Sequence, residues 1–146
     1  MAVRIKPDSA EFRSNLASAF LQSGQVAEAV AQWRETLRLQ PDKLGPQISL
    51  AWVLATTSDS AIRNGAEALD LAQRARRAAN GRNLMTFRVL AAALAEQGQF
   101  AQAIETARDG MRRGDAMGQF SLVGSLQEDL VLYQQGIPLR ESVPSK

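Results

Sequence analysis

Apolar residues recur at helical spacing along most of the chain, and the stripes that they form are separated by glycine or proline. Within residues 10–42, two such stripes flank Gly24. Glycine readily takes the left-handed conformation that ends a helix, and proline cannot continue one. The pattern therefore predicts a helical hairpin that turns at Gly24 and stops at Pro41. Its stripes are Phe12, Leu16, Ala19 and Phe20, and then Val26, Ala29, Val30, Trp33 and Leu37.

This hairpin belongs to a repeating pattern. Residues 38–42 (RLQPD) resemble residues 4–8 (RIKPD), and the two prolines lie 34 positions apart. Residues 84–114 repeat the two stripes around Gly98, and their alanines at 91 and 103 match those at 17 and 29. Small residues at these places predict that paired helices approach closely. A period of this length is typical of stacked helical hairpins, each of which buries its apolar face against the next.

The middle unit and the end of the chain depart from the period. Helices over about 46–56 and 65–78 flank the polar stretch TTSDSAIRNG, whose extra residues predict a lengthened turn. Asn64, and Asp8 before the first helix, are placed to cap helices because a glutamate follows each of them by three positions. A last amphipathic segment, 115–135, has no partner helix after it and predicts a capping helix, followed by a frayed, flexible tail over 137–146.

Together these elements predict an all-α domain over residues 1–136. Its repeats span about 9–42, 43–81 and 83–114, and the capping helix closes the array. Composition agrees, since Ala, Gln, Leu, Arg and Glu are abundant and strand-forming residues are sparse.

The motif positions resemble the tetratricopeptide repeat. The first unit matches through Leu16, Ala17, Phe20, Gly24, Ala29, Trp33 and Pro41. The middle unit matches through Leu50, Ala51, Leu54, Ala68 and Ala75, and the third through Leu90, Ala91, Leu94, Gly98 and Ala103. Thr36 stands where the family prefers Ala, and the middle unit lacks the turn glycine. The resemblance implies a right-handed superhelix, an α-solenoid, whose first helices line a concave groove that binds a protein or peptide.

Two narrower resemblances concern shorter segments. SNLASAFLQSGQ resembles the superhelix of O-linked N-acetylglucosamine transferase, where an Asn at the place of Asn15 grips peptide backbone; Ser49 and Val89 stand at the equivalent places here. LAWVLATTSDSAIRNGAEAL, LAAALAEQGQF and YQQGIPLRE resemble the C-terminal end of large bacterial multidomain tetratricopeptide proteins. The second resemblance implies a C-terminal piece of a longer protein, with Pro7 closing a repeat that lies upstream.

The first resemblance, to the repeat itself, assigns side chains to the groove. They are Glu11, Asn15, Ser18, Gln22, Ser49, Trp52, Arg88 and Glu96. Further positions that face the same way are Ser14, Ile48, Thr56, Met85, Val89 and Ala92. Asn15 either binds a peptide through its amide or is simply solvated. Trp52 is either a partly exposed anchor for a partner or is covered by the long turn, with Arg63 stacked on the indole. The positions that form a carboxylate clamp in some members hold no cation here, which argues against that mode.

Composition narrows the chemistry. The absence of Cys and His removes structural zinc, thiol nucleophiles and the usual general base. Together with the resemblance to an interaction repeat, it leads us to expect no metal, no cofactor and no enzymatic activity. It leaves the compartment open, with the cytoplasm as the default. No apolar run is long enough to span a bilayer. A stripe of basic residues has acidic neighbours and no interleaved aromatics, which favours a solvated face over nucleic-acid binding. It comprises Arg74, Arg76, Arg77, Arg82, Arg112 and Arg113.

Three functions remain open at this point. The first is a non-enzymatic interaction module that binds a peptide or protein segment in the groove. The second is the substrate-presenting region of a larger glycosyltransferase-type enzyme. The third is a structural solenoid terminus that self-associates through the N-terminal repeat face around Phe12, where a preceding hairpin is expected to pack.

Overall fold

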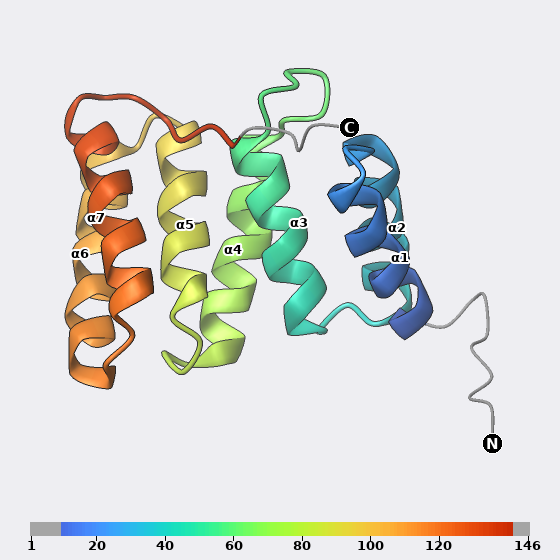
Figure 1. The fold of residues 1–146 in the computed structure, drawn as a ribbon, viewed down its shortest axis with the longest axis horizontal. Helices are drawn as coiled ribbons and strands as arrows, with labels where there is room; N and C mark the ends of the chain where they lie inside the picture. Colours follow the sequence, from blue (N-terminus) through green and yellow to red (C-terminus); the bar gives the residue numbers. More distant parts are fainter. Residues whose placement is uncertain (1–9, 142–146) are drawn as a thin grey trace.

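The computed structural model describes residues 10–141 (Figure 1). Within this range the chain is all-α, and its one β-type pairing is an isolated bridge between Thr57 and Glu141. The helices are α1 (Ala10–Gln22), α2 (Val26–Leu39), α3 (Leu44–Thr56), α4 (Gly65–Ala79), α5 (Met85–Glu96), α6 (Phe100–Met117) and α7 (Phe120–Gln134). The predictions made for Pro7, for Asp8 and for residues 142–146 lie outside the described residues.

Both hairpin turns that were predicted at glycine are confirmed. Gly24 and Gly98 have φ angles of 80° and 77°, in the left-handed region that favours glycine. After each glycine, the next amide donates to a carbonyl five residues back, with N–O distances of 2.8 Å and 2.9 Å. The two turns therefore share one local geometry, and the sequence repeat is a structural repeat at this level.

The long turn of the middle unit is also confirmed, and it is anchored at its end. The side chain of Asn64 accepts a hydrogen bond from the backbone N–H of Glu67 at 3.1 Å, as a helix cap does. The backbone N–H of Asn64 donates to the carbonyl of Leu54 at 2.9 Å. The cap of α4 is thus tied to the last turn of α3.

The third unit is longer than predicted. α6 does not stop at Gly114 but continues to Met117, and α7 begins at Phe120 rather than near 115. Gly110 and Gly114 stay helical because neighbouring helices use the space that they leave. A Cβ atom at Gly110 would lie 2.9 Å from the Cβ of Phe87, and one at Gly114 would lie 2.6 Å from a methyl group of Val123. Tertiary contact here overrides the weak helix propensity of glycine.

Alanines mark the closest approaches between helices. Those at positions 17, 29, 91 and 103 are all fully buried, which confirms the expectation from the sequence. Each helix packs against the next, and α3 also packs against α5. In Figure 1, α3, α5 and α7 lie side by side, with α4 and α6 behind them. This packing of neighbouring helices is consistent with a helical repeat.

The first hairpin is covered less than the others. On α1 the buried residues are Ala10 and Ala17, whereas Leu16 and Phe20 from its apolar stripe are half-buried and Ala19 is exposed. The helix against which α1 packs is α2, and α2 in turn packs against α3. The stripe of α1 is therefore only partly covered within the described residues.

Candidate functional site

The structure divides the predicted groove residues into two groups. One lies exposed on α1 and comprises Glu11, Asn15, Ser18 and Gln22. The other is half-buried on α3 and α5 and comprises Ser49, Trp52, Arg88 and Glu96. Because α3 and α5 pack against each other, the second group brings together side chains from two helices. We refer to this surface of α3 and α5 as the α3–α5 face.

Three further positions that were predicted to face the groove are buried instead. Thr56, Val89 and Ala92 are 1%, 0% and 1% exposed. The prediction was wrong for them because α3 and α5 approach closely enough to enclose the side chains between them. The surface of α3 and α5 that is open to a ligand is therefore narrower than helical spacing indicates.

Trp52 is half-buried, and its cover differs from the one with Arg63 that the sequence suggested. The guanidinium of Arg88 stacks on the indole ring, 4.6 Å from the ring centroid. The indole N–H donates to a carboxylate oxygen of Glu141 at 3.0 Å. The expected partner Arg63 points elsewhere, toward Glu96. The assignment of Arg63 to Trp52 was therefore wrong, because α5 supplies a closer cation.

Arg88 is fixed from its other side by Asp129 of α7. Its Nε donates to one oxygen of that carboxylate at 2.8 Å, and its Nη2 donates to the other at 3.3 Å. Asp129 is 2% exposed. Burial disfavours the charged form of Arg88, but the hydrogen bonds and charge of Asp129 outweigh it, so the pKa of Arg88 is raised. Arg88 thus stays charged and is held rigidly over Trp52.

Asp129 was not predicted from the sequence, although a signal for it was present. It lies on the buried stripe of α7, between Leu126 and Tyr133. A carboxylate on an apolar stripe needs a cation, because an unpaired buried charge is costly. Tyr133, 1% exposed, has a hydroxyl group that hydrogen-bonds to no described residue. Burial raises the pKa of Tyr133 well above its ordinary value, and the charge of Asp129 raises it further.

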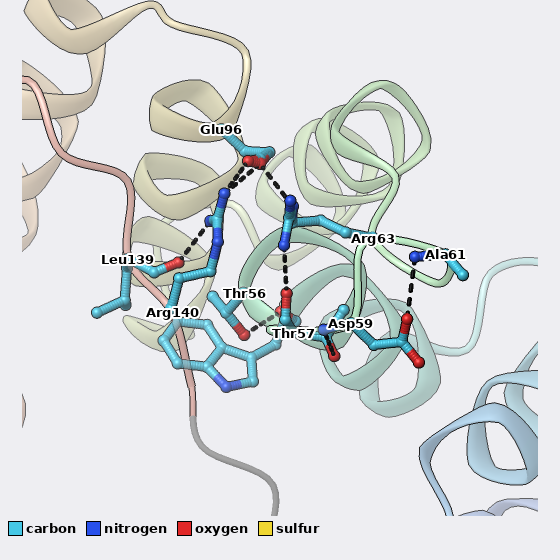
Figure 2. A network of polar contacts seen from close by, with 9 residues as sticks. Thr56, Thr57, Asp59, Ala61, Arg63, Glu96, Leu139 and Arg140 are labelled. Atoms are coloured by element: carbon cyan, nitrogen blue, oxygen red, sulfur yellow. Dashed lines mark hydrogen bonds and ion pairs between the residues drawn. The ribbon is translucent and has the colours of Figure 1, made fainter.

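Glu96, at the end of α5, is the centre of a second network (Figure 2). Its carboxylate accepts two hydrogen bonds from Nη2 of Arg140, at 2.6 Å and 3.1 Å. Nε of Arg63 lies 3.3 Å from the same carboxylate, and Nη1 of Arg63 donates to the carbonyl of Thr57 at 3.0 Å. Glu96 therefore joins α5, the long turn and the segment after α7.

The segment after α7 is not frayed as far as Glu141. It runs from the end of α7 past the ends of α5 and α3 (Figure 1). The backbone N–H of Glu141 donates to the carbonyl of Thr56 at 2.8 Å, and Glu141 forms a parallel bridge with Thr57. Residues 137–141 belong to the predicted tail, and the α3–α5 face supplies them with partners that the sequence pattern did not reveal. We call residues 137–141 the tail segment.

The basic stripe is partly used within the fold. Arg76 and Arg113 lie over the ring of Phe87, 4.3 Å and 5.3 Å from its centroid. Asp109 pairs with Arg112 and Arg113. A cavity of about 460 Å³ opens beside these residues, and its lining carries both positive and negative groups. The stripe is thus a surface of mixed charge, in which two arginines lie over one phenylalanine ring, rather than a uniform basic patch.

In the described part of the chain, no cluster of three or more His, Cys, Asp or Glu residues is placed to hold a metal ion. None of the described helices combines the length and the apolar character needed to cross a membrane. What the α3–α5 face offers chemically is an indole N–H, a guanidinium, a carboxylate and the C-terminal carbonyl of α3, which the tail segment occupies. Comparison of the sequence with protein-family models and with curated proteins finds no match.

Proposed function

We propose that this protein is a tetratricopeptide-type α-solenoid that binds an extended peptide segment of another protein, without catalysing a reaction. The observation that carries the proposal is the tail segment, which already lies on the α3–α5 face in the manner of a bound peptide. It makes one backbone hydrogen bond to Thr56 and side-chain bonds to Trp52 and Glu96. Backbone bonds that give affinity and side-chain contacts that give specificity are the usual means of recognising extended peptides.

Two further features support the proposal. The turns at Gly24 and Gly98 share one geometry, and the buried alanines recur at the motif positions of the repeat. Asn15 is exposed on α1, where its amide is free to donate to and accept from a peptide backbone. We infer that a partner peptide extends from the α3–α5 face toward α1.

A peptide-display screen on the full chain tests this function. The selected peptides are then measured against two single variants, Asn15→Ala on α1 and a matched control, Glu28→Ala, at an exposed position of α2. We expect the first variant to weaken binding about tenfold, as loss of a central contact does, and the control to leave it unchanged. A screen that enriches no peptide, or equal losses in both variants, would contradict the proposal.

Self-association through α1 is a second candidate, favoured by the half-buried Leu16 and Phe20 and the exposed Ala19. A half-covered apolar stripe is the feature on which a second hairpin packs in a helical array. Sedimentation at several concentrations tests it, with Phe20→Gln as the disrupting variant. A species that stays monomeric across the whole range in both proteins would count against it.

A further inference from the structure

The two side chains that end the tail segment make opposite-signed contacts on the α3–α5 face. Arg140 binds the carboxylate of Glu96, and Glu141 accepts from the indole of Trp52, over which Arg88 is stacked. Neighbouring residues of an extended chain point to opposite sides. The α3–α5 face therefore binds the side chains of two successive residues, a cation at Glu96 of α5 and an anion at Trp52 of α3.

The receiving groups are held by contacts that do not involve the tail segment. Glu96 is also paired with Arg63, which is bonded in turn to the carbonyl of Thr57. Arg88 is held over Trp52 by Asp129. These supports keep the acceptor and donor groups in place when the tail segment leaves, so the face is preorganised for a ligand.

The end of α3 also offers a backbone acceptor to a ligand. The last carbonyl groups of a helix have no partner within that helix. The carbonyl of Thr56, the last residue of α3, is bonded by the N–H of Glu141. Any extended chain laid along this helix end can make that bond, whatever its sequence.

The tail segment is held by Leu139, which packs against the apolar cluster around Leu126, and by polar contacts from two side chains that stay open to water. The side chain of Arg140 is 33% exposed, and Glu141 is exposed. Ion pairs at such positions contribute little, because water and salt screen them. The tail segment owes its occupancy to the short connection from α7, which gives it an effective concentration of about millimolar.

From this we propose, resting on the function proposed above, that the tail segment is an internal ligand of the α3–α5 face. The external partner is then an extended segment in which a basic residue is followed directly by an acidic one, and it binds by displacing the tail segment. This assigns both a ligand chemistry and a built-in competitor to the face.

The test uses the full chain and a capped six-residue peptide with the sequence of residues 136–141, Gly-Ile-Pro-Leu-Arg-Glu. The double variant Arg140→Ala/Glu141→Ala removes both side-chain bonds of the tail segment, to Glu96 and to Trp52, and alters no residue of the face. We expect this variant to bind the labelled peptide about tenfold more tightly than the unaltered protein, because the tethered competitor has lost both of its side-chain bonds to the face. A control variant, Glu105→Ala/Arg108→Ala on the exposed surface of α6, should bind the peptide as the unaltered protein does.

A second peptide with the order of the charged pair reversed, Gly-Ile-Pro-Leu-Glu-Arg, has the same composition and should bind neither protein measurably. Equal affinity of the first peptide for the unaltered protein and the double variant would overturn the proposal. So would equal binding of the two peptides, or no binding to the double variant.

Trp52 provides an independent readout, since the other tryptophan, Trp33, is buried at 2% exposure. Loss of the Glu141 contact should shift the emission of the double variant to longer wavelength, and adding the first peptide should reverse the shift. An unchanged spectrum would oppose the proposal. So would a concentration-dependent dimer that the double variant abolishes, because the tail would then lie on a second copy.

These outcomes separate the two proposals. If display yields ligands but the six-residue peptide does not bind, the internal-ligand proposal fails and the interaction function stands. If display yields no ligand and the six-residue peptide binds neither protein, both proposals fail.

Discussion

The first hairpin and the third unit have the same turn and different surroundings. Both turn at a glycine with φ near 80°, and both place fully buried alanines where their helices meet. However, α1 buries two of its residues, whereas α5, enclosed by α3, α4 and α6, buries eight. The hairpin is therefore a local product of its own sequence, while burial is decided by how many neighbours a helix has.

Truncating one phenylalanine in each of these two regions tests how well each is enclosed, and the buried one should cause the greatest loss of stability. Phe87→Ala removes a ring that is 1% exposed, and it should lower the free energy of unfolding by about 3–5 kcal/mol. Phe20→Ala removes the same group from a half-buried position of α1 and should cost about half as much. Urea denaturation of the two variants checks this. Equal losses would show that the first hairpin is as well enclosed as the third unit.

Breaking the ion pair between Arg88 and Asp129 should cause the second-greatest loss of stability. Asp129→Asn leaves the guanidinium without its countercharge and should destabilise the protein by about 2 kcal/mol. We place it below the value for a fully buried pair because the Arg88 side chain is 22% exposed. Arg34→Gln, which breaks the exposed pair with Glu67 in the first half of the chain, is the matched control and should cost about 0–1 kcal/mol. Thermal melts at low and high salt distinguish the two pairs, since only the exposed one should be screened.

Replacing glycines by alanine in α6 and α7 should change stability in opposite directions at two positions. Gly110→Ala places a methyl group 2.9 Å from the Cβ of Phe87 and should cost about 1–3 kcal/mol. Gly124→Ala, on the open surface of α7 with nothing within 4 Å, should instead stabilise by up to about 1 kcal/mol. The denaturation midpoints of the two variants test this. Stabilisation by both substitutions would show that α5 and α6 have room to separate.

The smallest effect concerns Tyr133, the single tyrosine. Folding raises its pKa, so the stability that depends on the neutral phenol is present below the unfolded pKa of about 10 and is lost as pH rises toward the folded value. Absorbance titration should show ionisation only together with unfolding. Tyr133→Phe should change stability at neutral pH by less than about 1 kcal/mol, since the hydroxyl hydrogen-bonds to no described residue, and should remove this alkaline loss. Ionisation near pH 10 in the folded protein would contradict the burial.

Much of the fold could be predicted because its signals are local. The glycine turns, the cap at Asn64 and the buried alanines all follow from residues close together in the sequence. The end of α6 was misplaced because Gly114 reads as a stop locally, while Val123 and Leu84 occupy the space beside it. A glycine that ends a helix and one that admits a neighbour look alike until the neighbour is known.

The candidate site was predicted in part. Trp52, Arg88 and Glu96 were assigned to one face by repeat position, and they do lie on the packed pair α3 and α5. Their partners were not predicted, because Asp129 and Glu141 are separated from them by tens of residues of chain. Periodicity indicates which way a side chain points, but it does not indicate which distant segment meets it.

Local sequence was enough to predict most helices, their turns and the small residues at their closest approaches, since each depends on backbone preference and on side chains within a few turns. The tertiary structure alone decided that Arg88 pairs with Asp129 and that the tail segment crosses the α3–α5 face. Those contacts join segments tens of residues apart in the sequence, so they form only once the helices that carry them have packed together.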